Sequence, residues 1–121
     1  MEGMRPKDML GRQGEELAAG FVEETGQQVV DRNWRGPAGE LDIVALEGAT
    51  VVVSEVKTRR NPDYGHPFEA ITPAKVTRLQ IIARQWLRAH GLATAELRID
   101  AIAVLDDGTG QPVIERLKAI G

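Results

Sequence analysis

The order of the predicted elements constrains the fold more than any other feature of the sequence. Apolar residues at helical spacing predict one helix from about Asp8 to Glu24 and a second from Pro73 to just before Gly91. Three consecutive strands are predicted between these helices, and two more follow the second helix. Three strands between two helices do not fit a simple strand–helix alternation. We therefore expect a single α/β domain over residues 1–121, with one mixed sheet and helices packed on it.

Turn-forming residues set the limits of these elements. Thr72 followed by Pro73 predicts the N-cap and first position of the second helix. Asn61-Pro62 and the glycine and proline around His66 predict a loop over residues 59–71. The five predicted strands cover residues 27–34, 40–46, 51–58, 96–105 and 113–117.

The content of metal-binding residues restricts the chemistry. The chain has no cysteine and two histidines, which excludes disulfide scaffolds, thiolate metal clusters and cysteine nucleophiles. A metal site must then use oxygen ligands, which favours magnesium, manganese or calcium over zinc. No apolar segment has the length of a signal peptide or a membrane span, so we expect a soluble, cytoplasmic protein.

The distribution of charge favours a nucleic-acid partner more than the total charge does. The net charge is −3, which on its own argues against nucleic acid. Residues 57–90, however, contain seven basic and two acidic residues and carry +5, which leaves −8 for the rest of the chain. A basic segment in an acidic chain can form a local phosphate-binding surface. A solvated helix face and a charged loop would give the same composition.

The second and third predicted strands bring two acidic residues together. A two-residue turn at Gly48-Ala49 sets a register in which Asp42 lies opposite Glu55, and Glu40 lies opposite Lys57. Residues that face each other across two strands have Cβ atoms roughly 4.5–5.5 Å apart. Strand alternation also places Glu40 and Asp42 on one face, together with Val44 and Leu46, and places Glu55 and Lys57 on one face.

Adjacent carboxylates predict a metal site. They repel each other unless a cation lies between them, and magnesium is typically held by one or two carboxylates together with waters and phosphate oxygens. The Lys57 ammonium would lie beside that site, where it could help to deprotonate a nucleophile or stabilise developing charge. The alternative is a glutamate–lysine ion-pair ladder on an exposed strand. The run of valines at 51–53 argues against it, since it is typical of a central strand.

Further candidate residues lie outside this hairpin. Glu15 is at the edge of the apolar stripe of the first helix, where it could reach over the sheet, whereas Glu16 points to solvent. The alternative for Glu15 is an ordinary exposed glutamate. Four basic side chains could contact phosphates or could be lone exposed cations: Arg35, Arg59, Lys75 and Arg78. We expect core positions for Trp34 and Trp86, and a structural pairing of Asp100 with an arginine.

The sequence resembles the PD-(D/E)xK nuclease superfamily and, within it, the bacterial YraN-like family. The resemblance covers nearly the whole chain. It rests on Gly11-Arg12-Gln13-Gly14-Glu15, Arg32-Asn33-Trp34-Arg35, Gly39-Glu40-Leu41-Asp42-Ile43-Val44, Val53-Ser54-Glu55-Val56-Lys57-Thr58-Arg59, Gly65, Pro73-Ala74-Lys75 with Arg78, and Arg98-Ile99-Asp100. Leu41 stands where the superfamily nominally has a proline.

The resemblance implies a restriction-endonuclease-like α-β-β-β-α-β core, similar to that of archaeal Holliday-junction resolvases. It implies that Asp42 and Glu55 are metal ligands, that Lys57 is the catalytic lysine, and that Glu15 is an acid supplied by the helix. The expected function is a Mg²⁺- or Mn²⁺-dependent nuclease that acts on DNA, including branched or structured DNA. Its further expected partners are a second copy of the chain and a DNA-processing protein. The alternatives are a non-catalytic nucleic-acid-binding module and a protein-interaction domain with a vestigial site.

Overall fold

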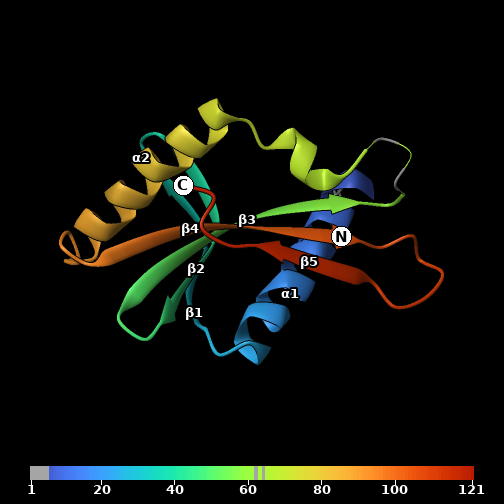
Figure 1. The fold of residues 1–121 in the computed structure, drawn as a ribbon, viewed down its shortest axis with the longest axis horizontal. Helices are drawn as coiled ribbons and strands as arrows, with labels where there is room; N and C mark the ends of the chain where they lie inside the picture. The colour runs from blue at the N-terminus through green and yellow to red at the C-terminus, as the bar shows by residue number, and fades with distance from the viewer. Residues whose placement is uncertain (1–5, 62, 64) are drawn as a thin grey trace.

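The described residues form a five-stranded mixed sheet with one long helix on each face (Figure 1). The computed structural model describes residues 6–61, 63 and 65–121. The predicted order of elements is confirmed. The elements are α1 (Pro6–Glu24), β1 (Gln28–Gly36), β2 (Gly39–Glu47), β3 (Thr50–Arg59), the short 3-10 helix η2 (Pro67–Ala70), α2 (Pro73–Ala89), β4 (Glu96–Leu105) and β5 (Val113–Leu117).

The strands lie in the sheet in the order in which they occur in the chain, from β1 to β5. The β3–β4 pair is parallel and the other pairs are antiparallel. A parallel pair needs a crossover connection, and α2 supplies it. The expected mixed sheet is therefore confirmed, and β3 lies at its centre.

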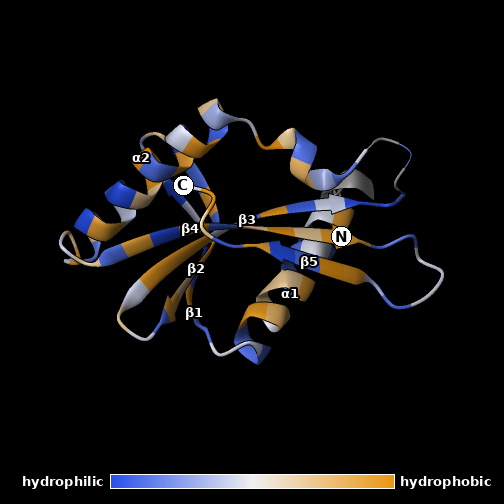
Figure 2. Ribbon diagram, viewed as in Figure 1, coloured by the Kyte–Doolittle hydropathy of each residue, from blue (hydrophilic) through white to orange (hydrophobic). Residues whose placement is uncertain are grey.

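Each helix buries its apolar stripe against one face of the sheet. Polar and apolar residues alternate along both helices (Figure 2). The α2 side of the sheet holds a cluster of buried residues that includes Val44, Val53, Ile82 and Trp86. The α1 side holds a second cluster that includes Ala18, Val22, Ile43, Ile102 and Val104. The predicted core position of Trp86 is confirmed, and Trp34 packs against the same α2-side cluster.

Helix α1 includes residues before its predicted start, and small residues form most of its buried side. It begins at Pro6, two residues before the predicted Asp8. The buried positions are Gly14, Ala18, Ala19 and Val22, whereas the larger Leu17 and Phe21 are half-buried. The small residues lie closest to the sheet because they let the helix approach it.

Helix α2 begins as predicted. The Thr72 hydroxyl accepts a hydrogen bond of 3.2 Å from the Lys75 amide, and Pro73 occupies the first helical position. The predicted loop between β3 and α2 contains η2, which the sequence did not suggest. Neither helix in the described part of the chain has the length and apolar character needed to cross a bilayer.

Candidate active site

The β2–β3 hairpin has the predicted register. Five ladder pairs, from Glu47↔Thr50 to Ile43↔Ser54, match it. The ladder ends at Ile43 and Ser54, one residue before Asp42. Beyond this point the Asp42 side chain connects the two strands, because its Oδ2 accepts a hydrogen bond of 2.8 Å from the Val56 amide. Asp42 is thereby fixed to β3 at the point where the two strands stop exchanging backbone hydrogen bonds.

The Asp42 and Glu55 carboxyl groups lie beside each other. Burial, a hydrogen bond with Glu55 and the negative charge of Glu55 raise the pKa of Asp42 from 3.8 to about 8. The hydrogen bond from the Val56 amide lowers this pKa and only partly offsets the increase. Asp42 therefore retains a proton near neutral pH unless a cation lies near it. This geometry is the one that the register predicts.

Lys57 completes a group of three charged side chains. Its Nζ lies 3.6 Å from Glu55 Oε2, so the two side chains share a face as expected. Their side chains are only 25% and 18% exposed, respectively. Such limited exposure is not that of a surface ion-pair ladder, and it follows from the central place of β3 in the sheet.

Helix α1 brings Glu15 toward the sheet. A Cβ on the neighbouring Gly14 would overlap the Thr58 side chain of β3, so glycine is needed for this close approach. Burial raises the pKa of Glu15, while Asn33 and Arg32 lower it. Glu16, by contrast, is 72% exposed and pairs with Arg32. The predicted orientations of the two glutamates are confirmed.

Glu15 does not join the same ligand set as Asp42 and Glu55. Its negative charge contributes to the raised pKa of Asp42, so it lies within electrostatic range. Within residues 6–61, 63 and 65–121, however, no group of three or more histidine, cysteine, aspartate or glutamate residues is close enough to hold one metal ion. The structure therefore brings two carboxylates together and leaves the third outside the set.

The alternation of side chains between the two faces of β2 is interrupted at Asp42. The expectation that residues 40, 42, 44 and 46 share one face is therefore wrong. Leu41 belongs to the buried cluster on the α2 side, whereas Ile43 belongs to the cluster on the α1 side. Strict alternation would place both residues on one side. Strand β1 changes sides at the corresponding point, since Arg32 pairs with Glu16 of α1 and Trp34 packs on the α2 side.

Asn33 explains this interruption and is a site residue that the sequence did not identify. It has a φ of 55°, a conformation that asparagine tolerates better than most residues. The ladder pairs on either side of it, Arg32↔Ile43 and Trp34↔Leu41, place it across from Asp42. Asparagine is a poor strand former, so its place within a predicted strand was the available signal.

The expected position of Glu40 opposite Lys57 is wrong. Glu40 pairs with Arg35 of β1 instead, with Arg35 Nη2 2.8 Å from Glu40 Oε2. It lines an open groove of about 1040 Å³ between α1 and the β1–β2 hairpin, together with Glu15, Asn33 and Arg35. The negative charge of Glu40 raises the pKa of Glu15. The groove thus brings Glu40 within electrostatic range of Glu15, which in turn lies within range of Asp42.

The four predicted phosphate contacts do not form one cluster. Arg35 is 80% exposed at the groove, and Arg59 donates to the Thr58 carbonyl at the end of β3. Lys75 and Arg78 lie on α2, where they donate to the carbonyls of Ala70 and Ala38.

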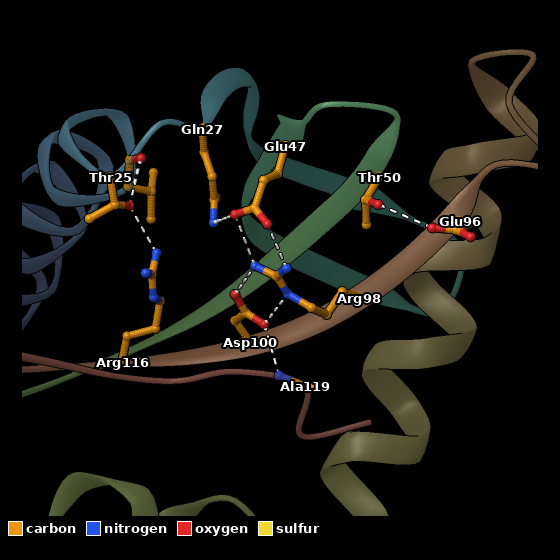
Figure 3. A network of polar contacts seen from close by, with 10 residues as sticks. Thr25, Gln27, Glu47, Thr50, Glu96, Arg98, Asp100, Arg116 and Ala119 are labelled. Atoms are coloured by element: carbon orange, nitrogen blue, oxygen red, sulfur yellow. Dashed lines mark hydrogen bonds and ion pairs between the residues drawn. The ribbon is translucent and has the colours of Figure 1, made fainter.

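A second charged cluster is structural (Figure 3). Asp100 is fully buried and accepts hydrogen bonds from Arg98, at 2.9 and 3.0 Å, and from the Ala119 amide. Arg98 also binds Glu47, at 2.8 and 3.3 Å, and Gln27 donates to Glu47. The predicted pairing of Asp100 with an arginine is confirmed. The cluster joins β4 to the turn end of the β2–β3 hairpin, away from the Asp42–Glu55 pair.

Comparison with known proteins gives the family. The model of "Uncharacterised protein family UPF0102" matches residues 14–104. A UPF0102 protein of Arthrobacter sp. (strain FB24) is 56% identical over 98% of this chain and all of the relative. UPF0102 proteins of Paenarthrobacter aurescens (strain TC1) and Streptomyces griseus subsp. griseus are 53% and 45% identical, over 97% of this chain in each case and 97% and 99% of the relatives. The match includes every residue of the Asp42–Glu55–Lys57 group, and the chain belongs to the UPF0102 family.

Proposed function

We propose that this protein is a divalent-metal-dependent nuclease of the PD-(D/E)xK superfamily that hydrolyses phosphodiester bonds, with DNA as the favoured substrate. The observation that carries the proposal is the position of Asp42. Its carboxylate lies beside that of Glu55 where the β2–β3 ladder ends, and the Lys57 ammonium is 3.6 Å from Glu55. A fold has no structural need for two half-buried carboxylates in contact, since their repulsion destabilises it.

The donor atoms fit Mg²⁺ or Mn²⁺. Asp42 and Glu55 offer only oxygen ligands, and two carboxylates are the number that magnesium typically takes from a protein. The raised pKa of Asp42 supports this assignment, because a divalent cation would replace the proton that Asp42 otherwise retains. A bound Mg²⁺ or Mn²⁺ would supply Lewis acidity toward a phosphate and toward a bound water.

The residues around the pair have separate roles in this proposal. Lys57 lies beside the carboxylates, where its ammonium can hold a phosphate oxygen or stabilise the developing negative charge. Glu15 is half-buried on α1 with a raised pKa, and it can orient a water or carry a proton at the edge of the site. The Asn33 backbone positions the strand opposite Asp42.

Cleavage assays test this function. The purified protein is incubated with single-stranded, duplex, flapped and four-way DNA, and with RNA, in Mg²⁺, Mn²⁺ or EDTA. We expect cleavage of at least one DNA form with metal and none in EDTA. Asp42→Asn and Glu55→Gln should each reduce the rate at least about 100-fold, the scale seen when one charge-stabilising group is removed from an active site. Lys57→Ala should reduce the rate more than it weakens Mg²⁺ binding measured by calorimetry.

Glu23→Gln provides the matched control. Glu23 is an exposed carboxylate on α1, so its substitution changes the net charge by the same amount as either site variant. It should cleave at the parent rate. If Asp42→Asn cleaves as fast as the control, the proposed mechanism is wrong. DNA binding without cleavage under every metal condition would instead identify a binding module.

A further inference from the structure

Helix α2 carries more basic residues than any other helix or strand in the described part of the chain. Its 17 residues include four basic side chains and no acidic one: Lys75, Arg78, Arg84 and Arg88. The chain as a whole carries −3, so the helix at +4 leaves −7 for the remainder. Such a segregation of charge within 121 residues produces a local positive potential in an acidic protein.

The arginines of α2 share one face of the helix. At about 100° per residue, Arg78, Arg84 and Arg88 fall within a sector of about 120°. All three are exposed, and the buried residues of the helix lie on the opposite side. The exposed sector that holds the three arginines is opposite the side of α2 that packs on the sheet. It is called the basic face below and consists of Arg78, Arg84 and Arg88.

The charge of the basic face is not neutralised within the protein. Three other arginines form ion pairs: Arg32, Arg35 and Arg98. Arg78 donates to the neutral Ala38 carbonyl. In the described part of the chain, neither Arg84 nor Arg88 makes a side-chain hydrogen bond or an ion pair. The face therefore presents its arginine donors to solvent.

The basic face is connected to the candidate active site. Arg78 Nε lies 3.2 Å from the carbonyl oxygen of Ala38, which is in the β1–β2 turn four residues before Asp42. The Gln85 side chain accepts a hydrogen bond of 3.1 Å from the Ala38 amide. Gly39 has a φ of 148°, and a Cβ there would contact Ile82, so the turn packs tightly on α2. Arg78, at the N-terminal end of the basic face, therefore lies beside the start of β2, the strand that carries Asp42.

We propose that the basic face of α2 binds the phosphate backbone of a duplex segment that flanks the cleaved bond. This inference rests on the proposed function, since it supplies the duplex arm of the same substrate. Ten residues separate Arg78 from Arg88, a distance of about 15 Å along a helix, which equals the axial rise of about four base-pair steps of a DNA duplex. Guanidinium groups suit phosphate because they donate two hydrogen bonds in parallel. The contacts involve only the backbone, so they position the duplex without reading its sequence.

The test is the salt dependence of duplex binding. Fluorescence anisotropy is measured with a labelled 20-base-pair DNA in EDTA, between roughly 50 and 200 mM salt, a range over which phosphate contacts change affinity strongly. The variant is Arg84→Gln/Arg88→Gln, whose residues are exposed and outside the candidate active site. The control is Arg116→Gln/Lys118→Gln, which removes the same charge at β5 and beyond it. Circular dichroism verifies that both variants fold.

We expect the α2 variant to lose at least about tenfold in affinity at 100 mM salt, and its log–log salt slope to fall by about 1.8, as for two lost phosphate contacts. The control should bind like the parent. Equal binding by the two variants would overturn the inference, and an acidic protein would then be the better partner for this face. A cleavage assay on the same proteins distinguishes a failure of this inference from a failure of the proposed nuclease function. Binding that depends on α2 but gives no cleavage would refute the nuclease alone, whereas cleavage with an unaffected α2 variant would refute the basic face alone.

Discussion

Replacing Asp42 by asparagine should stabilise the metal-free protein. The fold raises the pKa of this carboxyl from 3.8 to about 8 through burial and through Glu55. A shift of this size corresponds to about 4 kcal/mol of destabilisation at pH 7. Asp42 is only half-buried, and water relieves part of this repulsion, so we expect Asp42→Asn to increase the free energy of unfolding by about 2–4 kcal/mol. The asparagine can still accept the hydrogen bond from the Val56 amide.

The pH dependence follows from the direction of the shift. Between pH 3.8 and about 8 the native protein holds a proton on Asp42 that the unfolded chain has released. The unfolding free energy of the parent therefore rises as the pH falls through this range, and the destabilisation is complete above about pH 8. The asparagine variant lacks this contribution. The difference between variant and parent should be small near pH 4 and largest above pH 8.

Urea denaturation in EDTA at pH 5, 7 and 9 measures this difference. Glu23→Gln, an exposed carboxylate on α1, is the control and should follow the parent at each pH. A stability difference between Asp42→Asn and the parent that stays constant from pH 5 to pH 9 would refute the reasoning. So would a variant that is less stable than the parent at pH 9.

Three other predictions concern the metal, the buried ion pair and the packing of α1. Magnesium or manganese at about 100 times its Kd should stabilise the parent by about 2.7 kcal/mol in thermal unfolding and leave the asparagine variant unchanged; equal shifts would place the metal elsewhere. Arg98→Met leaves Asp100 buried without its arginine partner and should lower the unfolding free energy by about 3–5 kcal/mol. The double variant Arg98→Met/Asp100→Leu should recover most of this loss. A loss below about 1 kcal/mol in Arg98→Met would show that the ion pair does not stabilise the fold. Gly14→Ala should destabilise the protein by about 1–3 kcal/mol, because the added Cβ overlaps Thr58. Gly20→Ala, whose Cβ would meet nothing within 4 Å, should stabilise the same helix. Similar effects of the two variants in urea denaturation would show that α1 is loosely packed.

The sequence predicted those features that depend on local chemistry. A two-residue turn and the valines of β3 determine the register of the hairpin, and the register places Asp42 beside Glu55. Thr72 and Pro73 likewise define the start of α2 through their own side chains.

The features that were missed depend on tertiary packing. The change of faces at Asp42 requires Asn33 to adopt a positive φ, and no periodicity of apolar residues reports such an angle. The pairing of Glu40 with Arg35 follows from that change, so the expected contact with Lys57 failed for the same reason. The buried stripe of α1 passes through small residues because the helix must lie close to Thr58, a requirement set by a strand more than 40 positions away.

The end of the β2–β3 ladder divides β2 into a part that pairs with β3 and an arm that packs on α2. On one side of Ile43 and Ser54 the strands are joined by backbone hydrogen bonds. On the other side the tip of the β1–β2 hairpin is joined to α2 through Ala38. One hydrogen bond, from the Val56 amide to Asp42, joins this arm to β3, and the buried Leu41 packs the arm against α2. The spacing of the carboxyl groups at 42 and 55 therefore depends on how the β1–β2 hairpin packs against α2, as well as on the register of the β2–β3 hairpin.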